Sequence, residues 1–420
     1  MTESSNYQTS NPPMANPYVG PRTFTYEQRH LFFGREREAR DLLARVVSER
    51  VLLFYAQSGA GKSSLLHTRL IPQLREEEGF AVLPVGRVSG ELPTGVTDVA
   101  NIYLFNLMTS LDQSNEEPQR LAQLPFSRFL ARSTSDDGRH WYYAAAPATP
   151  DLDFEVARIT EDEIMLAAYD PAIDDEVNAL AEDADAMASR SLTATASANA
   201  EQRYVLIIDQ FEEIITTHPH RRQAREIFFR QLNQALLDDP NLWVVLTLRE
   251  DYVAALDPYA HLMADKLRAR FYMERMGVDA AQAAVTQPAA LAGRPFAEGV
   301  AEALVDNLRR VKALGQVEEQ LGQYIEPVQL QVVCYQLWAK VIGHNANAAT
   351  ITLTDLQQSG DVNTALADFY NQALATVLAS FSISERQLRT WFDHKLITEA
   401  GTRGTVYQGL TETEGMPNPL

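Results

Sequence analysis

The sequence predicts an α/β protein built on a parallel β-sheet flanked by helices. Three apolar stretches carry this prediction. Val51–Tyr55 runs into a short loop with two glycines that opens a helix, and Tyr204–Ile208 and Trp243–Leu248 each end at a charged residue. Strands that are apolar throughout are typical of parallel sheets covered on both faces. Charged residues at their carboxyl ends are typical of a ligand-binding edge.

The composition limits the class of protein further. The 420 residues are 45% hydrophobic, which predicts a globular chain of two or three domains. The net charge of −20 argues against a broad, non-specific nucleic-acid binder, although a local basic face stays possible. The single cysteine, Cys334, excludes a disulfide framework and fits a reducing cytosol. With no long apolar run and no signal peptide, we expect a soluble, cytoplasmic chain without a membrane span.

The loop after the first apolar run has the pattern of a phosphate-binding loop. Gly61-Lys62-Ser63 follows Ala56 at the spacing G-x-x-x-x-G-K-[ST], with alanine at the first glycine position, where only a small residue is needed. Backbone N–H groups at the start of a helix bind phosphate, Lys62 is expected to reach the β- and γ-phosphates, and the Ser63 hydroxyl is expected to bind Mg²⁺. The predicted nucleotide contacts of the loop are Ser58, Gly59, Ala60, Gly61, Lys62, Ser63 and Ser64.

Two short motifs precede this loop. Residues 1–15 are polar and proline-rich, which predicts a disordered leader. Asn16-Pro17-Tyr18 follows, and then Phe33-Gly34-Arg35 before a helical pattern from Glu36 to Val47. We expect Phe33, Gly34 and Arg35 to lie beside the nucleotide base. A helix N-terminus with a local ion pair would explain the same residues, and both interpretations stay open.

The stretch after the loop is regular at first and then loses its periodicity. Phe80–Val85 predicts a second strand, and Asn101–Leu111 predicts a helix. Residues 113–200 show little regular periodicity. Within them, 172–200 are rich in Ala, Asp, Glu and Ser, which indicates either a flexible acidic insertion or a short surface helix.

Two strand ends carry the candidate chemistry. Asp209 follows the strand Tyr204–Ile208 and is expected to hold the Mg²⁺ shell, while Glu212 or Glu213 is expected to orient the attacking water. Arg249 ends the strand that begins at Trp243, where it could sense the γ-phosphate. A local ion pair of Arg249 with a neighbouring acid is the alternative.

The rest of the chain is helical in pattern. A helix over 222–237 and a short strand over 270–273 complete the sheet region, and helices are predicted over 278–290 and 296–311. Pro327 suits the first turn of a further helix, in which Cys334 lies on the apolar stripe. Helices over 362–381 and 384–397 follow, the second with a capping box formed by Ser384 and Gln387.

Together these motifs resemble the STAND class of P-loop NTPases, and within it the novel STAND type-1 group of bacterial signalling and conflict proteins. The similarity spans about residues 16–415, and its most specific strings are Asp209-Gln210-Phe211-Glu212-Glu213 and Glu326-Pro327-Val328-Gln329-Leu330-Gln331. The resemblance implies a P-loop NTPase domain over 16–274, a helical lid over 275–345 and a winged-helix domain over 346–420.

The resemblance also implies roles for single residues. Lys62 and Ser63 would be the Walker A pair, Asp209 and Glu213 the Walker B acids and Arg249 the sensor, with Pro327 near the adenine. Ala56 departs from the family pattern. The chain ends at Leu420, inside the resembling winged helix and before the family's histidine-aspartate switch segment, so we expect the winged helix to be incomplete. A fragment of a longer product and a naturally shortened chain both stay open, and neither would be expected to carry full autoregulation.

The leading hypothesis is an ATP-dependent molecular switch in bacterial signalling or anti-phage defence. It would be closed with ADP, would form homo-oligomers with ATP and Mg²⁺, and would answer to a protein trigger and act on an effector. ATP is preferred to GTP because no Asn-Lys-x-Asp motif occurs. An initiator-like AAA+ ATPase on nucleic acid is one alternative, which the acidic balance disfavours despite basic residues over 386–403. A non-catalytic, nucleotide-gated scaffold is the other.

Overall fold

The computed structural model describes most of the chain between residues 16 and 397. The described residues are 16–90, 92–93, 95–96, 98–114, 116–144, 202–312, 319–344, 349–381, 383–397, 406, 412–413 and 415–417. The predicted leader, 1–15, and the predicted acidic insertion, 172–200, lie outside them.

A five-stranded sheet forms the centre of the larger body, and every strand pair in it is parallel. Its order is β2 (Ala81–Val82), β5 (Tyr204–Ile208), β6 (Leu242–Arg249), β1 (Val51–Ala56) and β7 (Arg270–Tyr272). In β1 and β6, Ala56 pairs with Arg249, so the carboxyl ends of the two strands are level. The predicted parallel sheet is confirmed. The carboxyl ends of β1, β5 and β6, where the sequence predicted the phosphate loop and the charged site residues, lie at one edge of it.

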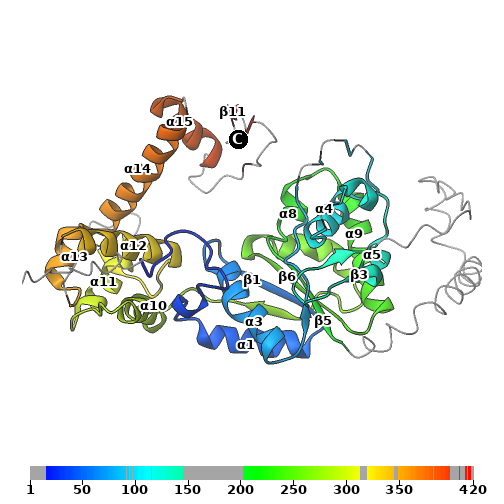
Figure 1. Ribbon diagram of the computed structural model, residues 1–420, viewed down its shortest axis with the longest axis horizontal. Coiled ribbons are helices and arrows are strands. Elements are labelled where there is room, and N and C mark those ends of the chain that lie inside the picture. The colour runs from blue at the N-terminus through cyan, green and yellow to red at the C-terminus, as the bar shows by residue number, and fades with distance from the viewer. Residues whose placement is uncertain are drawn as a thin grey trace, which may run out of the picture.

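Helices cover both faces of this sheet (Figure 1). On one face, Leu52 and Phe54 pack in a core with Leu42, and on the other Leu53 and Leu246 pack in a second core. This alternation follows from the two-residue period of a strand. The first face carries α1 (Glu36–Ser48), α2 (Lys62–Leu65), η2 (Leu66–Leu70) and α3 (Ile71–Glu76), and the second carries α4 (Ile102–Leu111), α5 (Phe126–Arg132) and α9 (Arg222–Asp238).

Smaller elements connect these layers, and several of them have no clear sequence signal. The helix after the phosphate loop contains Pro72 and still continues to Glu76, with a π-helical turn, η2, immediately before the proline. The connecting elements are η1 (Arg29–Leu31), η3 (Pro118–Leu121), β3 (Ser133–Thr134), β4 (Tyr142–Tyr143), α8 (Glu213–Thr216), η5 (Glu250–Tyr252) and η6 (Ala254–Leu262).

A smaller, helical body follows the sheet, and we call it the helical region (residues 275–359). It consists of α10 (Val278–Leu291), α11 (Val300–Leu308), β8 (Arg310–Lys312), β9 (Glu319–Leu321), α12 (Pro327–His344) and α13 (Leu353–Ser359). Its separate core includes Val285, Leu304, Cys334 and Trp338. Burial raises the pKa of the Cys334 thiol, in line with the predicted apolar environment. α11 begins later than predicted, because Gly299, in a left-handed conformation with φ +78°, precedes its first turn.

The last described elements extend from this region. α14 (Val362–Ser380) packs on α12, and the Lys340 ammonium lies 2.9 Å from the Asp368 carboxylate across that contact. α15 (Glu385–Trp391), η7 (Phe392–Leu396) and the strand pair β10 (Glu412–Thr413) and β11 (Met416–Pro417) follow (Figure 1). Ser384 caps α15 by accepting a hydrogen bond from the Gln387 N–H, at 3.2 Å. The winged-helix assignment and the domain boundaries stay predictions.

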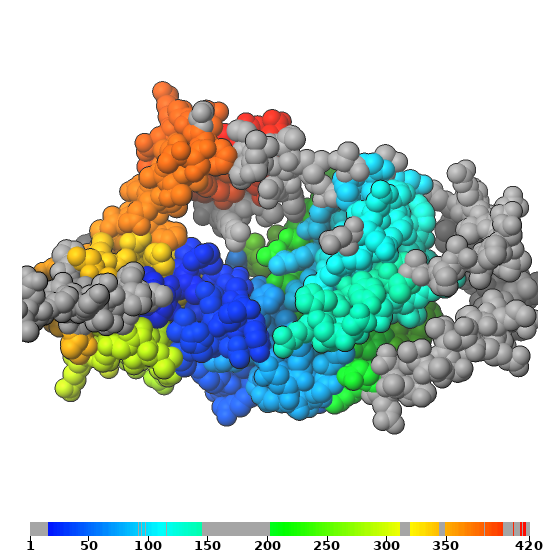
Figure 2. All heavy atoms as spheres, viewed as in Figure 1, coloured from blue at the N-terminus to red at the C-terminus, as the bar shows by residue number. Residues whose placement is uncertain are grey.

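Residues 16–33, which we call the N-terminal segment, link the two bodies (Figure 2). The Asn16 side-chain amide donates to the Tyr335 carbonyl at 3.0 Å, and the Tyr18 hydroxyl donates to the Val285 carbonyl at 2.5 Å. Farther along, the Phe24 N–H donates to the Ser64 hydroxyl at 3.2 Å, next to the phosphate loop. The segment therefore contacts both the helical region and the start of the loop helix.

None of the helices within the described residues has the length and apolar character that a membrane span requires.

Candidate functional site

The loop between β1 and α2 has the backbone shape that its glycines predict. Gly59 and Gly61 adopt left-handed conformations, with φ of +76° and +95°. Such values cost little only for glycine. The loop N–H groups then meet the N-terminus of the continuous helix that runs from Lys62 to Glu76, where an anion is stabilised by unpaired N–H groups and by the helix dipole.

Lys62 lies folded over this loop. Its ammonium donates to the Ala56 carbonyl at 3.2 Å and to the Gln57 carbonyl at 3.4 Å. Burial lowers the pKa of Lys62, while the nearby carboxylates of Glu212 and Asp209 act in the opposite direction. The ammonium is therefore held by weak neutral acceptors that a phosphate oxygen could replace.

Ser63 and Asp209 meet across the sheet edge. The Ser63 hydroxyl donates to Asp209 Oδ2 at 2.7 Å, and the Thr247 hydroxyl donates to Asp209 Oδ1. Asp209 is only 1% exposed. A hydroxyl and a carboxylate are hard oxygen ligands, which suit Mg²⁺. The described residues contain no group of three or more His, Cys, Asp or Glu that could hold a metal.

A third group, Arg87, also contacts Asp209. Its guanidinium lies 3.2 Å from Asp209 Oδ2, the oxygen to which Ser63 donates. Arg87 follows the edge strand β2, and the hydroxyl of Ser89 beside it donates to the carboxylate of Glu213. Asp209 and Glu213 are thus both held by the chain that follows β2.

The two glutamates lie on different sides of Asp209. Glu212 accepts a hydrogen bond from the Arg249 N–H at 3.2 Å, and its carboxylate is attracted by the charge of Lys62. Glu213 instead accepts a hydrogen bond from the Ser89 hydroxyl and is attracted by the charge of Arg87. Burial raises the pKa of both carboxyl groups. Two carboxyl groups with raised pKa values beside a phosphate loop are suitable proton acceptors.

Arg249 forms the local ion pair that the sequence left open. Its guanidinium lies 2.6 Å from the Asp251 carboxylate and 5.5 Å from the centre of the Tyr252 ring. Its backbone is level with Ala56 at the start of the loop, and its charge is close enough to lower the pKa of Lys62. The sensor role of Arg249 stays a prediction.

The predicted base-side residues border a narrow cavity between the loop and the helical region. The cavity has a volume of about 70 Å³ and is lined in part by Phe33, Arg35, Gly61 and Pro327. Arg35 is buried, forms an ion pair with Glu38, and donates to the Glu274 carbonyl at 3.0 Å. The local ion pair is therefore present, and Phe33 and Arg35 also lie beside the cavity. Contact with a base stays a prediction.

The helical region approaches this edge very closely. A Cβ added to Gly34, whose φ is +84°, would lie 2.2 Å from the Ala280 carbonyl oxygen of α10. A Cβ added to Gly59 would lie 3.3 Å from Val328 Cγ2 in the first turn of α12. The absence of side chains at these two glycines lets α10 lie against Gly34, just before α1, and α12 lie against the phosphate loop at Gly59.

The sequence did not point to several of these contacts. Arg87, Ser89, Thr247 and Val328 were not among the predicted site residues. Thr247 precedes the predicted sensor by two residues, and Val328 follows Pro327, so each stood beside a recognised signal. Arg87 and Ser89 had no such signal, because only the strand order brings the end of β2 next to that of β5.

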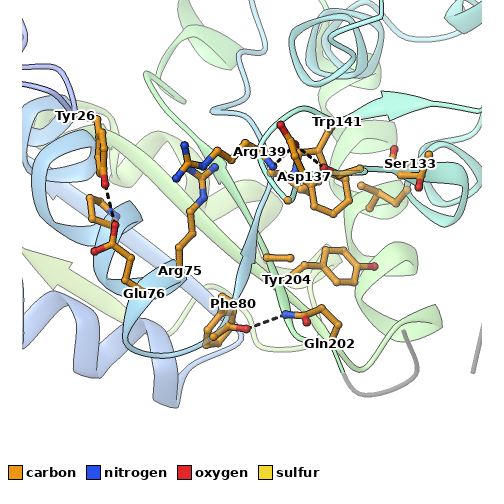
Figure 3. A pocket seen from close by; sticks show the side chains of 18 of the residues that line it. Tyr26, Arg75, Glu76, Phe80, Ser133, Asp137, Arg139, Trp141, Gln202 and Tyr204 are labelled. Atoms are coloured by element: carbon orange, nitrogen blue, oxygen red, sulfur yellow. Dashed lines mark hydrogen bonds between the residues drawn. The ribbon is translucent and has the colours of Figure 1, made fainter. Parts of the chain in front are cut away.

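A second and larger cavity lies at the opposite edge of the sheet (Figure 3). Its volume is about 870 Å³, and its walls include the amino ends of β2 and β5. Arg75 and Arg139 approach each other there, but four carboxylates also line it. Because the acidic side chains outnumber the basic ones, this cavity does not suit a nucleotide phosphate. The acidic residues are Glu27, Glu76, Asp137 and Asp239.

The fold and the loop edge define a P-loop NTPase: a parallel sheet, a glycine-bearing loop with Lys62 and Ser63 at its end, and Asp209 directly after β5, which β6 separates from the loop strand β1. More narrowly, residues 17–408 match the family described as Novel STAND NTPase 1, and the chain belongs to that family. The resemblance drawn from the motifs is confirmed.

Solved structures add a more distant similarity. A Walker-type ATPase of Pyrococcus abyssi is 14% identical, with a TM-score of 0.40, over 90% of this chain and 82% of the other. The ORC2 protein of Aeropyrum pernix, solved in ADPNP–ADP complexes, is 12% identical, with a TM-score of 0.42, over 90% and 86%. Similarity at this level transfers no property to the chain. No curated protein matches its sequence significantly.

Proposed function

We propose that this chain is an ATP-dependent molecular switch, closed with ADP and assembling with ATP. The observation that carries the proposal is the contact between the helical region and the phosphate loop, where Val328 of α12 lies against Gly59. Because of this contact, nucleotide binding in the loop would affect the position of the helical region.

The space available supports this coupling. Small-molecule sites usually have volumes of about 300 Å³ or more, and the cavity beside the loop has about 70 Å³. A base and ribose entering there would require α12 or the N-terminal segment to shift. A ligand changes such an equilibrium only by binding one arrangement more tightly, and here the arrangements would differ in how Val328 and Gln331 border the cavity.

ATP and ADP would be distinguished at the phosphate end of the site, by contacts with the γ-phosphate. The additional phosphoryl group carries negative charge toward Lys62 and Arg249. Asp251, the present partner of Arg249, is 54% exposed, and exposed ion pairs contribute only about 0–1 kcal/mol. A γ-phosphate could therefore replace Asp251 at small cost, which would make Arg249 the sensor.

The remaining roles follow the chemistry of the side chains. Ser63 and Asp209 would hold Mg²⁺, which supplies positive charge to the phosphates when bound. Glu213, with Glu212 as the alternate, would orient and deprotonate the attacking water, and slow hydrolysis would reset the switch. We further propose, on the family resemblance, ATP rather than GTP as ligand, a role in bacterial signalling or anti-phage defence, and a protein trigger and effector.

The switch predicts a nucleotide-dependent movement between the two bodies. Spin labels on Leu237→Cys in α9 and Leu291→Cys in α10, both exposed positions, would report the distance between them. Cys334 is buried and the pKa of its thiol is raised, so it should stay unlabelled. In a Glu213→Gln background, we expect the distance distribution with Mg-ATP to differ from that with ADP by several ångströms.

The matched control places both labels on the sheet body. Leu237→Cys with Arg37→Cys on α1, whose side chain is 86% exposed, should give one distance in every nucleotide state. Identical distributions with ATP and ADP for the Leu237–Leu291 pair, at saturating nucleotide, would contradict the proposed movement.

A further inference from the structure

Arg87 is held in a defined position in the chain that follows β2. Its backbone N–H donates to the Ser110 hydroxyl of α4 at 2.9 Å. The preceding residue, Gly86, donates to the Ile207 carbonyl at 2.8 Å, and a Cβ on it would lie 2.4 Å from Leu107 Cδ1 of α4. The close packing of α4 on this glycine therefore directs the Arg87 side chain along the carboxyl ends of the strands.

The Arg87 guanidinium contacts the Asp209 carboxylate, which a metal ion at this site would need as a ligand. One nitrogen lies 3.2 Å from Asp209 Oδ2, and the other lies 3.5 Å from the Asp209 carbonyl. Asp209 Oδ2 also accepts the Ser63 hydroxyl, and Oδ1 accepts the Thr247 hydroxyl. Both carboxylate oxygens are therefore engaged. Arg87 is the cation that contacts Asp209 directly, while Lys62 lies close enough to interact with it electrostatically.

Arg87 and Asp209 differ in how easily each side chain can move into water. Asp209 is 1% exposed, so it requires a counter-charge in every state. The Arg87 side chain is 37% exposed and can turn into water at small cost. A divalent cation at Ser63 and Asp209 would lie beside the guanidinium, and like charges that close repel each other strongly in a partly buried site.

We propose that Arg87 is a displaceable counter-ion of Asp209 that competes with Mg²⁺ and so sets how strongly nucleotide binding depends on the metal. The inference rests on the proposed nucleotide site. Without Mg²⁺, Arg87 neutralises Asp209 and lowers its repulsion of the phosphates. With Mg²⁺, the ion takes over that charge and Arg87 is released.

The competition predicts two opposite effects of Arg87→Gln. Binding of a fluorescent ADP analogue in EDTA should weaken at least about fivefold, because Asp209 then lacks its directly paired cation. The Mg²⁺ concentration that gives half of the increase in ADP affinity should fall at least about fivefold, because Mg²⁺ no longer competes with a guanidinium. Arg87→Lys keeps the charge but loses the two-nitrogen contact, so its shifts should have the same signs and be smaller. A merely structural arginine would weaken binding equally with and without Mg²⁺.

Arg270→Gln is the matched control. Arg270 is 40% exposed and pairs with Asp257 at 3.2 Å, away from the loop, so its loss should leave both quantities unchanged. If the wild-type protein binds the analogue and Arg87→Gln and Arg87→Lys both keep its Mg²⁺ dependence, the inference is wrong while the nucleotide site stands. If the wild-type protein binds no nucleotide in either condition, the proposed function and this inference fail together.

Discussion

Glu213→Gln is expected to bind ATP with nearly unchanged affinity and to hydrolyse it at least about a hundredfold more slowly, as for the loss of a general base. The reason lies in the surroundings of the carboxyl group. Burial raises the pKa of Glu213, so its carboxylate accepts a proton more readily than an exposed glutamate does. A glutamine could keep the hydrogen bond to Ser89 but could not accept the proton.

Single-turnover conversion of bound ATP to ADP measures this effect. Glu212→Gln is the matched comparison, because Glu212 is also buried and its pKa is also raised. Since the active form is the carboxylate, the wild-type rate should fall on acidification at a higher pH than for an exposed glutamate, and this limb should vanish in Glu213→Gln. If Glu212→Gln is the slow variant, the two roles are exchanged. If neither variant is slow, the general base lies elsewhere.

Lys62→Ala is expected to lose at least about tenfold in Mg-ATP affinity, which corresponds to about 1.4 kcal/mol. Lys62 is the positive charge that lies inside the loop, where its ammonium donates to two carbonyl oxygens. Removing Lys62 takes a positive charge from the phosphate position. The loop should keep its conformation, because that conformation depends on the left-handed backbone of Gly59 and Gly61.

Calorimetric titration of the folded variant checks this value. Lys340→Ala serves as the control, because Lys340 of α12 pairs with Asp368 of α14, away from the loop. Unchanged affinity in a folded Lys62→Ala protein would remove the assignment of residues 56–63 as the phosphate-binding loop.

The sheet was predictable because its chemistry is local. β1, β5 and most of β6 are apolar, and a predicted site residue or loop lies at or directly after the carboxyl end of each, so the strands and the position of the candidate site could be predicted together. α5 and the β3–β4 pair were missed, because residues 113–144 fix their structure by packing on α9 and α4 rather than by a regular apolar period.

The tertiary contacts of the site were not predictable to the same degree. Pro327 correctly marked the start of α12, but nothing local says that the next residue, Val328, meets Gly59. Phe33 and Arg35 border the cavity as expected, yet Arg35 also forms the ion pair that had been the alternative. The role of Arg87 required the order of the strands, which a single sequence does not give.

The most direct test of the switch is the mass of the protein in each nucleotide state, measured by light scattering coupled to size exclusion. Glu213→Gln with Mg-ATP should form larger assemblies than with ADP. Adding Arg249→Ala should abolish the difference, because Arg249 is the cation proposed to exchange Asp251 for the γ-phosphate. Equal masses with ATP, with ADP and without nucleotide, at concentrations where ATP is bound, would contradict a switch that assembles in the ATP state.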